Sequence, residues 1–540
     1  MKRLMIIVGA ILCLGSGLPC HAAQQPIVGD WIGQIDLAGS WQRINFHFKI
    51  EGQSITGTLD LPRQNRTGLS LNRVTLDSSH VRIEWQGSQG LGVFDGQFRD
   101  GAISGDFQQG EIKHPFRVVR TSMFDPKESQ RYSGSYRLAK DRFIDIGAFS
   151  ENEDRPVFFD SQTRRTGVLY ALSDTEFFSG PSYGNLFPME VRATFTKNAR
   201  GEVTGLKWQE SDSHVFTAKK VSPYTQEEVS FQNGDVTLHG TLTAPATKGQ
   251  HPALVVVPGS GSFRRPGGHW IHFFVRQGIA VLVFDKRGSG DSTGDWKKST
   301  YEDLAADTLA GVQALKNHKN INPKQIGLLG HSEGGWVVPL AASLSTDIAF
   351  LIIRSGSALP TWKTVLHESE GKLRDGNKLS EAEIRAALAL KQSVERMALA
   401  GTPWDEAWSQ INAAYEKAHN EKWFGYVGGI PKDHWYWQWW RLRGGYDPAP
   451  ALEKVRCPVL VLLGGVDWNI PSKESAVAFE SAFKKAGNKD FTVRILPEGN
   501  HGLLEAETGY DSEFPRLNRY VPGYMDGIAD WLLKRVNIKS

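Results

Sequence analysis

The fold of the second half of this chain is decided by the stretch Ile326-Gly327-Leu328-Leu329-Gly330-His331-Ser332-Glu333-Gly334. It begins as a short apolar run, which is typical of a buried strand in a parallel sheet. It ends in a G-x-S-x-G motif, in which a serine lies on a sharp turn between a strand and a helix. Residues 335–342 continue as Gly-Trp-Val-Val-Pro-Leu-Ala-Ala and predict the first turns of a buried helix. The surroundings of Ser332 therefore indicate a nucleophile. The alternative is a serine in an ordinary glycine-rich turn.

The G-x-S-x-G motif occurs at two further places, and such chance matches are expected in a chain with 56 glycines. Residues 180–184 lie in a β-rich region and are followed by Asn185-Leu186-Phe187-Pro188, which does not begin a helix. Residues 290–294 lead into a polar run and indicate a loop. Because the motif needs a strand before it and a helix after it, only Ser332 stands in the predicted context.

Strand-like and helical segments alternate from Glu228 onward, which predicts a mostly parallel sheet flanked by helices. The strand-like runs lie at residues 253–257, 280–284, 326–329, 350–353, 459–463 and 491–495. A long helical stretch from about Pro360 to Leu452 separates the fourth run from the fifth, and Ser380-Glu381-Ala382-Glu383 within it is a capping box. An insertion of this size between two strands predicts a helical lid at about 360–452.

A serine hydroxyl needs a base to remove its proton, and the base needs an acid to hold its tautomer. With a strand-to-helix elbow of this type, the chain order is serine, acid, histidine. His501 follows the last strand-like run, and Asp467 is the only carboxylate in the loop after the run before it. We therefore predict His501 as the base and Asp467 as the acid, with Glu498 in reserve. The alternative is that both are loop residues without a catalytic role.

The negative oxygen of a tetrahedral intermediate needs two backbone N–H groups that already point toward it. One should belong to Glu333, the residue after the nucleophile. The other should come from Pro258-Gly259-Ser260-Gly261-Ser262, where glycine lets the backbone approach a substrate closely. We predict the N–H of Ser260, with that of Gly261 in reserve. A plain glycine-rich turn is the alternative.

Together, Pro258-Gly259-Ser260-Gly261, the segment 284–292, the Ser332 motif, Asp467 and His501 resemble the α/β-hydrolase superfamily, most closely its serine aminopeptidase-like and bacterial carboxylesterase branch. The resemblance covers about Glu228 to Val536. It implies a lid after the sixth strand, no cofactor and no metal, and a structural role for Asp285 and Arg287. One departure from the family pattern is Pro258, where many relatives carry a histidine before the glycine.

Residues from about Ile27 to Val221 show short alternating apolar runs separated by turns, which predicts antiparallel β structure. We predict a β domain at 24–124, a second β unit at 125–224 and the α/β-hydrolase domain at 225–540. Both β units begin alike, with Gly29-Asp30-Trp31 and Gly134-Ser135-Tyr136, although this similarity does not establish a repeat.

The first 23 residues read as a signal peptide, with a basic start, an apolar run at 4–14 and Ala22-Ala23 at the end. A lipid anchor at Cys20 is disfavoured because Pro19 stands where a small residue is normal. We therefore expect export to the periplasm or the outside of the cell. Cys457 is the only cysteine expected after cleavage, and it predicts no internal disulfide. The net charge of +3 gives no reason to expect a nucleic-acid partner.

The substrate is less well indicated than the reaction. Trp435 and Trp439 share a face of a predicted lid helix, where they would either line a pocket or hold the lid on the sheet. A peptidase that binds a free amine would need carboxylates, and Glu406, Glu416 and Asp433 do not stand out in the lid.

Three functions follow from these residues. The first is an exported serine esterase that cleaves a carboxylic ester of a small molecule through a Ser-Asp-His catalytic triad and an acyl-enzyme. The second is a serine aminopeptidase or other peptidase with the same triad, acting on short peptides. The third is a non-catalytic protein whose β region contacts a glycan or another envelope component.

Overall fold

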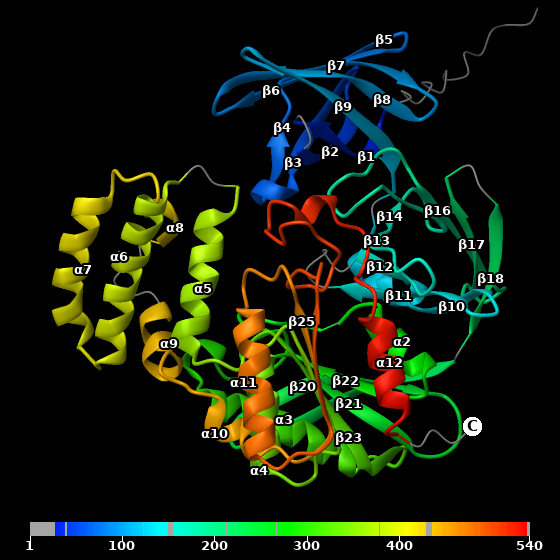
Figure 1. Cartoon of the computed structure of the whole chain (residues 1–540). Helices are drawn as coiled ribbons and strands as arrows, with labels where there is room; N and C mark the ends of the chain where they lie inside the picture. Colours follow the sequence, from blue (N-terminus) through cyan, green and yellow to red (C-terminus); the bar gives the residue numbers. More distant parts are fainter. Residues whose placement is uncertain are drawn as a thin grey trace, which may run out of the picture. The chain divides into compact units, whose positions relative to one another are not determined.

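A computed structural model describes residues 27–37, 40–122, 124–149, 155–211, 214–221, 223–265, 267–376, 379–427 and 435–536 (Figure 1). The predicted signal peptide, with Cys20, lies outside the described residues. The chain forms two compact units. One contains the described residues up to Ile35 together with Gln42–Arg120, and the other contains Asp36–Trp41 and the described residues from Thr121 onward.

The first unit is built on a nine-stranded sheet with the order β4-β3-β2-β1-β9-β8-β7-β6-β5. Its strands are β1 Gly29–Asp36, β2 Trp41–Glu51, β3 Ser54–Leu61, β4 Arg66–Ser70, β5 Arg73–Asp77, β6 His80–Gly87, β7 Gly90–Arg99, β8 Ala102–Gln109 and β9 Ile112–Thr121, and a short 3₁₀ helix Pro62–Gln64 joins β3 to β4. Alternate residues face inward, as the period-two pattern predicts, so Phe46 and Phe48 of β2 are both buried. The first β region is thus antiparallel, as predicted.

A second nine-stranded antiparallel sheet follows, with the order β13-β12-β11-β10-β18-β17-β16-β15-β14. Its strands are β10 Gly134–Ala139, β11 Arg142–Phe149, β12 Arg155–Asp160, β13 Thr166–Val168, β14 Tyr170–Ala171, β15 Glu176–Ser179, β16 Val191–Lys197, β17 Val203–Glu210 and β18 Val215–Val221, preceded by the 3₁₀ helix Pro126–Glu128 and by α1 Ser129–Tyr132. Both sheets place their first strand beside their last. Gly29 and Gly134, which open these first strands, both have positive φ angles, +121° and +143°. The two segments that begin alike in the sequence therefore form the first strands of two sheets with the same strand order.

The third sheet has eight strands in the order β19-β20-β22-β21-β23-β24-β25-β26. Its strands are β19 Tyr224–Asn233, β20 Val236–Pro245, β21 His251–Val257, β22 Ala280–Phe284, β23 Ile321–His331, β24 Leu351–Arg354, β25 Val459–Gly464 and β26 Phe491–Leu496. All six apolar runs of the sequence form strands, and their mutual pairings are parallel, as predicted. The hairpin β19–β20 adds two antiparallel strands at one edge.

Helices cover both faces of this third sheet. The flanking helices are α2 Trp270–Arg276, α3 Tyr301–Lys316, α4 Gly334–Leu344, α11 Ser472–Lys485 and α12 Met525–Leu533, with 3₁₀ turns at Trp296–Lys298 and Phe514–Arg516. Successive side chains of a strand point to opposite faces. Val255 of β21 therefore joins the core under α3, α4 and α11, whereas Val256 joins the core under α2 and α12. This arrangement is the predicted α/β-hydrolase fold.

The predicted lid is a group of helices between β24 and β25. They are α5 Thr361–Arg374, α6 Glu381–Leu399, α7 Trp404–Ala418, α8 Phe424–Val427, α9 Trp435–Arg443 and α10 Ala449–Leu452. Ser380 caps α6 with the predicted capping box. Helices α5, α6, α7 and α9 pack side by side around a shared apolar cluster that includes Ile411, Trp437 and Trp440 (Figure 1). Within the described ranges, no helix has both the length and the apolar character to cross a membrane.

The second sheet packs tightly against the hydrolase fold. Asp145 of β11 is fully buried and forms an ion pair with Arg276 of α2 at 2.9 Å. Phe159 of β12 belongs to the core on the α2 face of the third sheet. Gly184 lies so close to Pro515 that any larger residue would overlap it. The first of the two other G-x-S-x-G motifs therefore joins the two parts of this unit.

Candidate active site

Ser332 lies on a sharp turn between β23, which ends at His331, and α4, which begins at Gly334. Its φ angle is +53°, in the left-handed region that residues other than glycine rarely adopt. A side chain at Gly330 would overlap the backbone of Gly334, and a side chain at Gly334 would overlap that of Val257. The glycines of the motif are therefore required by close backbone approach, and the serine side chain is left at the carboxyl edge of the sheet.

His501 and Asp467 are joined by a hydrogen bond of 2.9 Å between Nδ1 and Oδ2. The other oxygen of Asp467 accepts hydrogen bonds from the backbone N–H groups of Asn469 and Ile470, at 2.9 and 3.1 Å. Because the ionised carboxylate only accepts hydrogen bonds, the proton of a neutral His501 ring is on Nδ1. Nε2 is left with a free lone pair and can act as a base. Glu498, the reserve acid, is exposed.

A cavity of about 950 Å³ brings most of the predicted site residues together. It is lined by Ser332 and His501, by Ser260 and Glu333 from the predicted oxyanion hole, and by Trp435 and Trp439 from the lid. Asp467 does not line the cavity and reaches it through His501. Residues far apart in the sequence thus meet at one opening beside the carboxyl edge of the sheet.

The loop after β21 lies directly against the serine. A Cβ atom placed on Gly259 would be 3.3 Å from Cβ of Ser332 and 3.8 Å from its Oγ. The reserve residue, Gly261, has a φ angle of +82°. The backbone of this loop is therefore close enough to direct N–H groups toward a carbonyl group bound at Ser332.

His331, next to the serine, is held in its neutral form. Burial, together with the positive charge of Arg354, lowers its pKa well below the ordinary value, and a proton on His501 acts in the same direction. Nδ1 of His331 lies 3.3 Å from the carbonyl oxygen of Arg354, and Nε2 lies 3.4 Å from a guanidinium nitrogen of the same residue. Since the carbonyl only accepts and the guanidinium only donates, the proton of His331 is on Nδ1. Its ring centre is 5.0 Å from that of His501, so an uncharged ring lies beside the predicted base.

Three buried charged residues lie behind the serine and were not predicted as a group. Lys286 forms an ion pair with Glu333, and Arg443 forms another with the same carboxylate at 2.7 Å. Burial lowers the pKa of the Lys286 ammonium, whereas the negative charge of Glu333 acts to raise it. Lys286 and Glu333 each lie two residues after the end of a strand, β22 and β23. Arg443 is distant from both in the chain, so no local pattern connects it to them.

The wall of the cavity contains further residues that the sequence did not point out. Glu368 of α5 is one of them, and burial raises the pKa of its carboxyl group, while the positive charges of Lys372 and Lys391, and a proton on His501 when it is present, act in the opposite direction. Tyr183, from the second β unit, is another. Its ring stacks on Phe514 with a centroid distance of 5.1 Å, and its hydroxyl lies 2.9 Å from that of Thr166.

The two predicted lid tryptophans line the cavity and also pack within the protein. The ring of Trp435 meets that of Trp296 edge-on at 5.1 Å, and Trp439 stacks on Tyr436 at 5.8 Å. The two roles considered from the sequence, lining a pocket and holding the lid in place, are therefore compatible. Among the residues that the structure describes, no three or more His, Cys, Asp or Glu side chains form a group that could hold a metal ion.

Comparison with known proteins agrees with this architecture. A family model described as serine aminopeptidase, S33, matches residues 249–508. Esterase EstD of Thermotoga maritima is 23% identical over 358 residues, which are 64% of this chain and 77% of that protein. Residues 225–540 make up a smaller share of this chain than the 64% that is aligned. The alignment with EstD must therefore extend into the region before residue 225. The quorum-quenching protein AidA of Acinetobacter baumannii is 32% identical over 136 residues, 24% of this chain and 43% of that protein.

Two solved structures are similar at 16% sequence identity. An esterase of Pyrococcus furiosus covers 58% of this chain, with 92% of its own chain aligned and a TM-score of 0.38. Acetyl xylan esterase 1 of Thermoanaerobacterium covers 59%, with 86% of its own chain aligned and a TM-score of 0.36.

Proposed function

We propose that this chain, a serine hydrolase of the α/β-hydrolase superfamily and its esterase branch, cleaves a carboxylic ester through a Ser332-Asp467-His501 triad and an acyl-enzyme. One observation carries the proposal: the carboxylate of Asp467 holds Nδ1 of His501, and the same ring lines a cavity with the strained Ser332. The similarity to esterase EstD supports an ester as the substrate.

The reaction follows from the positions of these groups. Nε2 of His501 takes the proton of the Ser332 hydroxyl as Oγ bonds to the ester carbonyl carbon. The carbonyl oxygen becomes negative and accepts hydrogen bonds from the backbone N–H groups of Glu333 and Ser260. The intermediate collapses, the bond to the alcohol oxygen breaks, and that oxygen takes the proton from His501. Water then repeats the sequence on the acyl-enzyme, which releases the acid and restores the serine.

Labelling with a fluorophosphonate probe tests the nucleophile. We expect the wild-type protein to be labelled and to hydrolyse p-nitrophenyl esters. Ser332→Ala should lose the label and at least about 10⁴-fold of the turnover, because the acyl-enzyme cannot form. Ser182→Ala and Ser292→Ala are matched controls from the other two G-x-S-x-G motifs, and both should remain labelled.

An unlabelled wild-type protein that is folded and inactive on short- and medium-chain esters would contradict the proposal. It would favour the non-catalytic alternative, in which the β region contacts a glycan or another envelope component.

A serine aminopeptidase with the same triad is the second candidate, and Glu368 favours it. This carboxylate lines the cavity and could accept hydrogen bonds from the free amine of a peptide. Glu406 and Glu416, which were considered from the sequence, are exposed, and Asp433 lies outside the described residues. In this case Glu368→Gln should raise the KM for amino-acid anilides and leave ester hydrolysis unchanged. Ester turnover without any anilide turnover by the wild type would exclude this candidate.

We also propose that the protein is exported to the periplasm or secreted, after removal of residues 1–23. The N-terminal mass of protein purified from periplasm and medium tests this. Mature protein that begins at Met1 and stays in the cytoplasm would refute export, and lipid attached at Cys20 would refute cleavage after residue 23.

A further inference from the structure

Three segments of the chain meet at a buried group of charges behind the nucleophile, formed by Lys286, Glu333 and Arg443. Lys286 follows β22, Glu333 follows Ser332, and Arg443 ends the lid helix α9. Their side chains are 4%, 3% and 0% exposed. Buried ion pairs contribute little net stability, because desolvation offsets the attraction between the charges. Their placement beside the reacting serine therefore suggests a role in the reaction.

Lys286 binds the peptide group that the reaction is expected to use. Its ammonium donates a hydrogen bond to the carbonyl oxygen of Gly259 at 3.0 Å. This carbonyl belongs to the same planar peptide as the N–H of Ser260, the predicted oxyanion donor. In a trans peptide the C=O and N–H bonds point in opposite directions. By holding the oxygen, Lys286 fixes the direction of that N–H.

The same ammonium also reaches the second predicted donor. Lys286 donates to the carboxylate of Glu333, whose backbone N–H is the other predicted member of the oxyanion hole. One cation thus contacts both backbone segments that must converge on the substrate oxygen. A cation that binds a carbonyl also polarises its peptide, which strengthens the N–H of that peptide as a donor.

Arg443 connects this group to the lid. Its guanidinium binds Glu333 at 2.7 Å and the carbonyl oxygens of Trp296 and Ser299, both at 2.7 Å. Trp296 in turn contacts the lid residue Trp435 and lies over the Lys286 ammonium, 5.9 Å from it. Glu333 is thereby held from two sides, by the lid and by Lys286.

We propose that Lys286 is a positioning residue that orients the Gly259–Ser260 peptide and the Glu333 backbone as the oxyanion hole, with Arg443 fixing Glu333 from the lid. The inference rests on the proposed function, because an oxyanion hole has a task only in acyl transfer. Lys286 acts through the backbone and does not touch the substrate.

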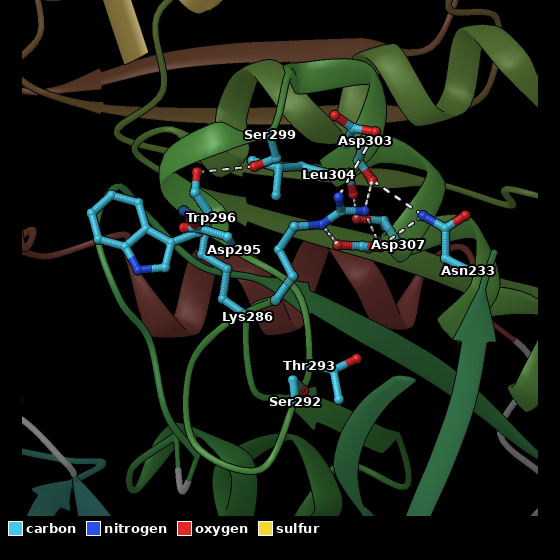
Figure 2. A network of polar contacts seen from close by, with 12 residues as sticks. Asn233, Lys286, Ser292, Thr293, Asp295, Trp296, Ser299, Asp303, Leu304 and Asp307 are labelled. Atoms are coloured by element: carbon cyan, nitrogen blue, oxygen red, sulfur yellow. Dashed lines mark hydrogen bonds and ion pairs between the residues drawn. The ribbon is translucent and has the colours of Figure 1, made fainter. Parts of the chain in front are cut away.

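The neighbouring residue, Arg287, is a natural control. It is buried in the same loop and forms a bidentate ion pair with Asp307 at 2.6 and 2.7 Å. Asp307 also accepts a hydrogen bond from Asn233, and Figure 2 shows these two side chains together, on the side of the network away from Trp296. Arg287 therefore holds the loop to α3, whereas Lys286 holds it to the predicted oxyanion hole.

The test compares Lys286→Met with Arg287→Met in the full chain. We expect Lys286→Met to lower kcat for p-nitrophenyl esters by about 10- to 100-fold, with KM within about threefold of the wild type. Calorimetric titration with an arylboronic acid, which forms a tetrahedral adduct with an active serine, should show a loss of affinity of similar size. Arg287→Met should lower Tm and leave kcat and boronate affinity unchanged.

Equal kcat and boronate affinity in Lys286→Met and the wild type would overturn the inference, as would equal losses in both variants. If Lys286→Met does not fold, Glu333→Gln keeps the backbone N–H and removes the ion pairs. It should lower kcat and boronate affinity by about three- to tenfold, and no change would equally overturn the inference. A folded wild-type protein that neither turns over esters nor binds the boronate would instead refute the proposed function.

Discussion

The two nitrogens of His501 have different surroundings, and this difference defines what the residue can do. Nδ1 is held by Asp467, and that carboxylate is itself fixed by two backbone N–H groups. When His501 accepts a proton, the positive charge is stabilised by Asp467 without rearrangement. The adjacent ring of His331 is neutral and does not oppose this charge.

Asp467→Asn tests this arrangement. The amide keeps the shape of the side chain but carries no charge, and its NH₂ group favours the wrong tautomer of His501. We expect kcat for p-nitrophenyl esters to fall by about 10⁴-fold, while the thermal unfolding temperature changes little. Glu498→Gln, which alters the reserve acid, is the control and should keep full activity. Loss of activity in Glu498→Gln with retention in Asp467→Asn would reverse the assignment.

The residues predicted for the triad share one local signal, which is a position in the loop or turn after a strand. Ser332 directly follows β23, and Asp467 and His501 lie in the loops that follow β25 and β26; the carboxyl ends of these three parallel strands meet at one edge of the sheet. Arg443 and Tyr183 could not be found in this way. Arg443 reaches Glu333 from a helix 110 residues away, and Tyr183 reaches the cavity from the β15–β16 loop of the second sheet. Such contacts depend on tertiary packing, for which no local pattern exists.

Helix α2 is one of the elements that join the second β sheet to the hydrolase fold, and two histidines at this junction are buried. His269, which precedes the helix, stacks on Phe159 and lies 3.0 Å from the hydroxyl of Tyr520. The ring of His272 lies 4.7 Å from that of Tyr224. Burial lowers the pKa of each to about 3, and the charge of Arg354 at His269 and of Lys220 at His272 acts in the same direction. Both rings are therefore neutral in the folded protein.

These histidines predict how stability depends on pH. Unfolding restores a pKa of about 6.5, so between about pH 3 and 6.5 the unfolded chain binds more protons than the folded one. The free energy of unfolding therefore falls as the pH drops below about 6.5, by about 2 kcal/mol per histidine at pH 5. Urea unfolding at several pH values measures this slope. The variant His269→Gln/His272→Phe should show a shallower slope, and an unchanged slope would contradict the assignment.

At the scale of the whole molecule, the two β sheets share a strand order but belong to different compact units. The hydrophobic pattern of the sequence predicts both β sheets and the hydrolase fold, because period-two alternation and buried apolar runs can be recognised within short segments of the chain. It does not tell which parts pack together. The division at 24–124, 125–224 and 225–540 remains a proposal, whereas contacts such as Asp145–Arg276 join the second sheet to the hydrolase fold.

Truncation separates the roles of the two β regions. All described residues that line the cavity belong to the unit that contains the hydrolase fold, in which Phe149 and Val157 come from strands of the second sheet and Tyr183 from its β15–β16 loop. A chain that begins at Thr121 should therefore fold and keep its ester turnover. A chain that begins at Glu227 removes Asp145, leaves Arg276 without its partner and exposes the apolar surface that Phe159 covers.

Loss of one partner of such a buried ion pair alone costs about 3–5 kcal/mol. We expect this shorter chain to aggregate or to lose its cooperative thermal transition, together with its turnover. Calorimetry and kcat/KM of the two purified chains check both outcomes. A stable and fully active chain from Glu227 would mean that the second β sheet is an accessory module. An inactive but folded chain from Thr121 would mean that the first β sheet takes part in the reaction.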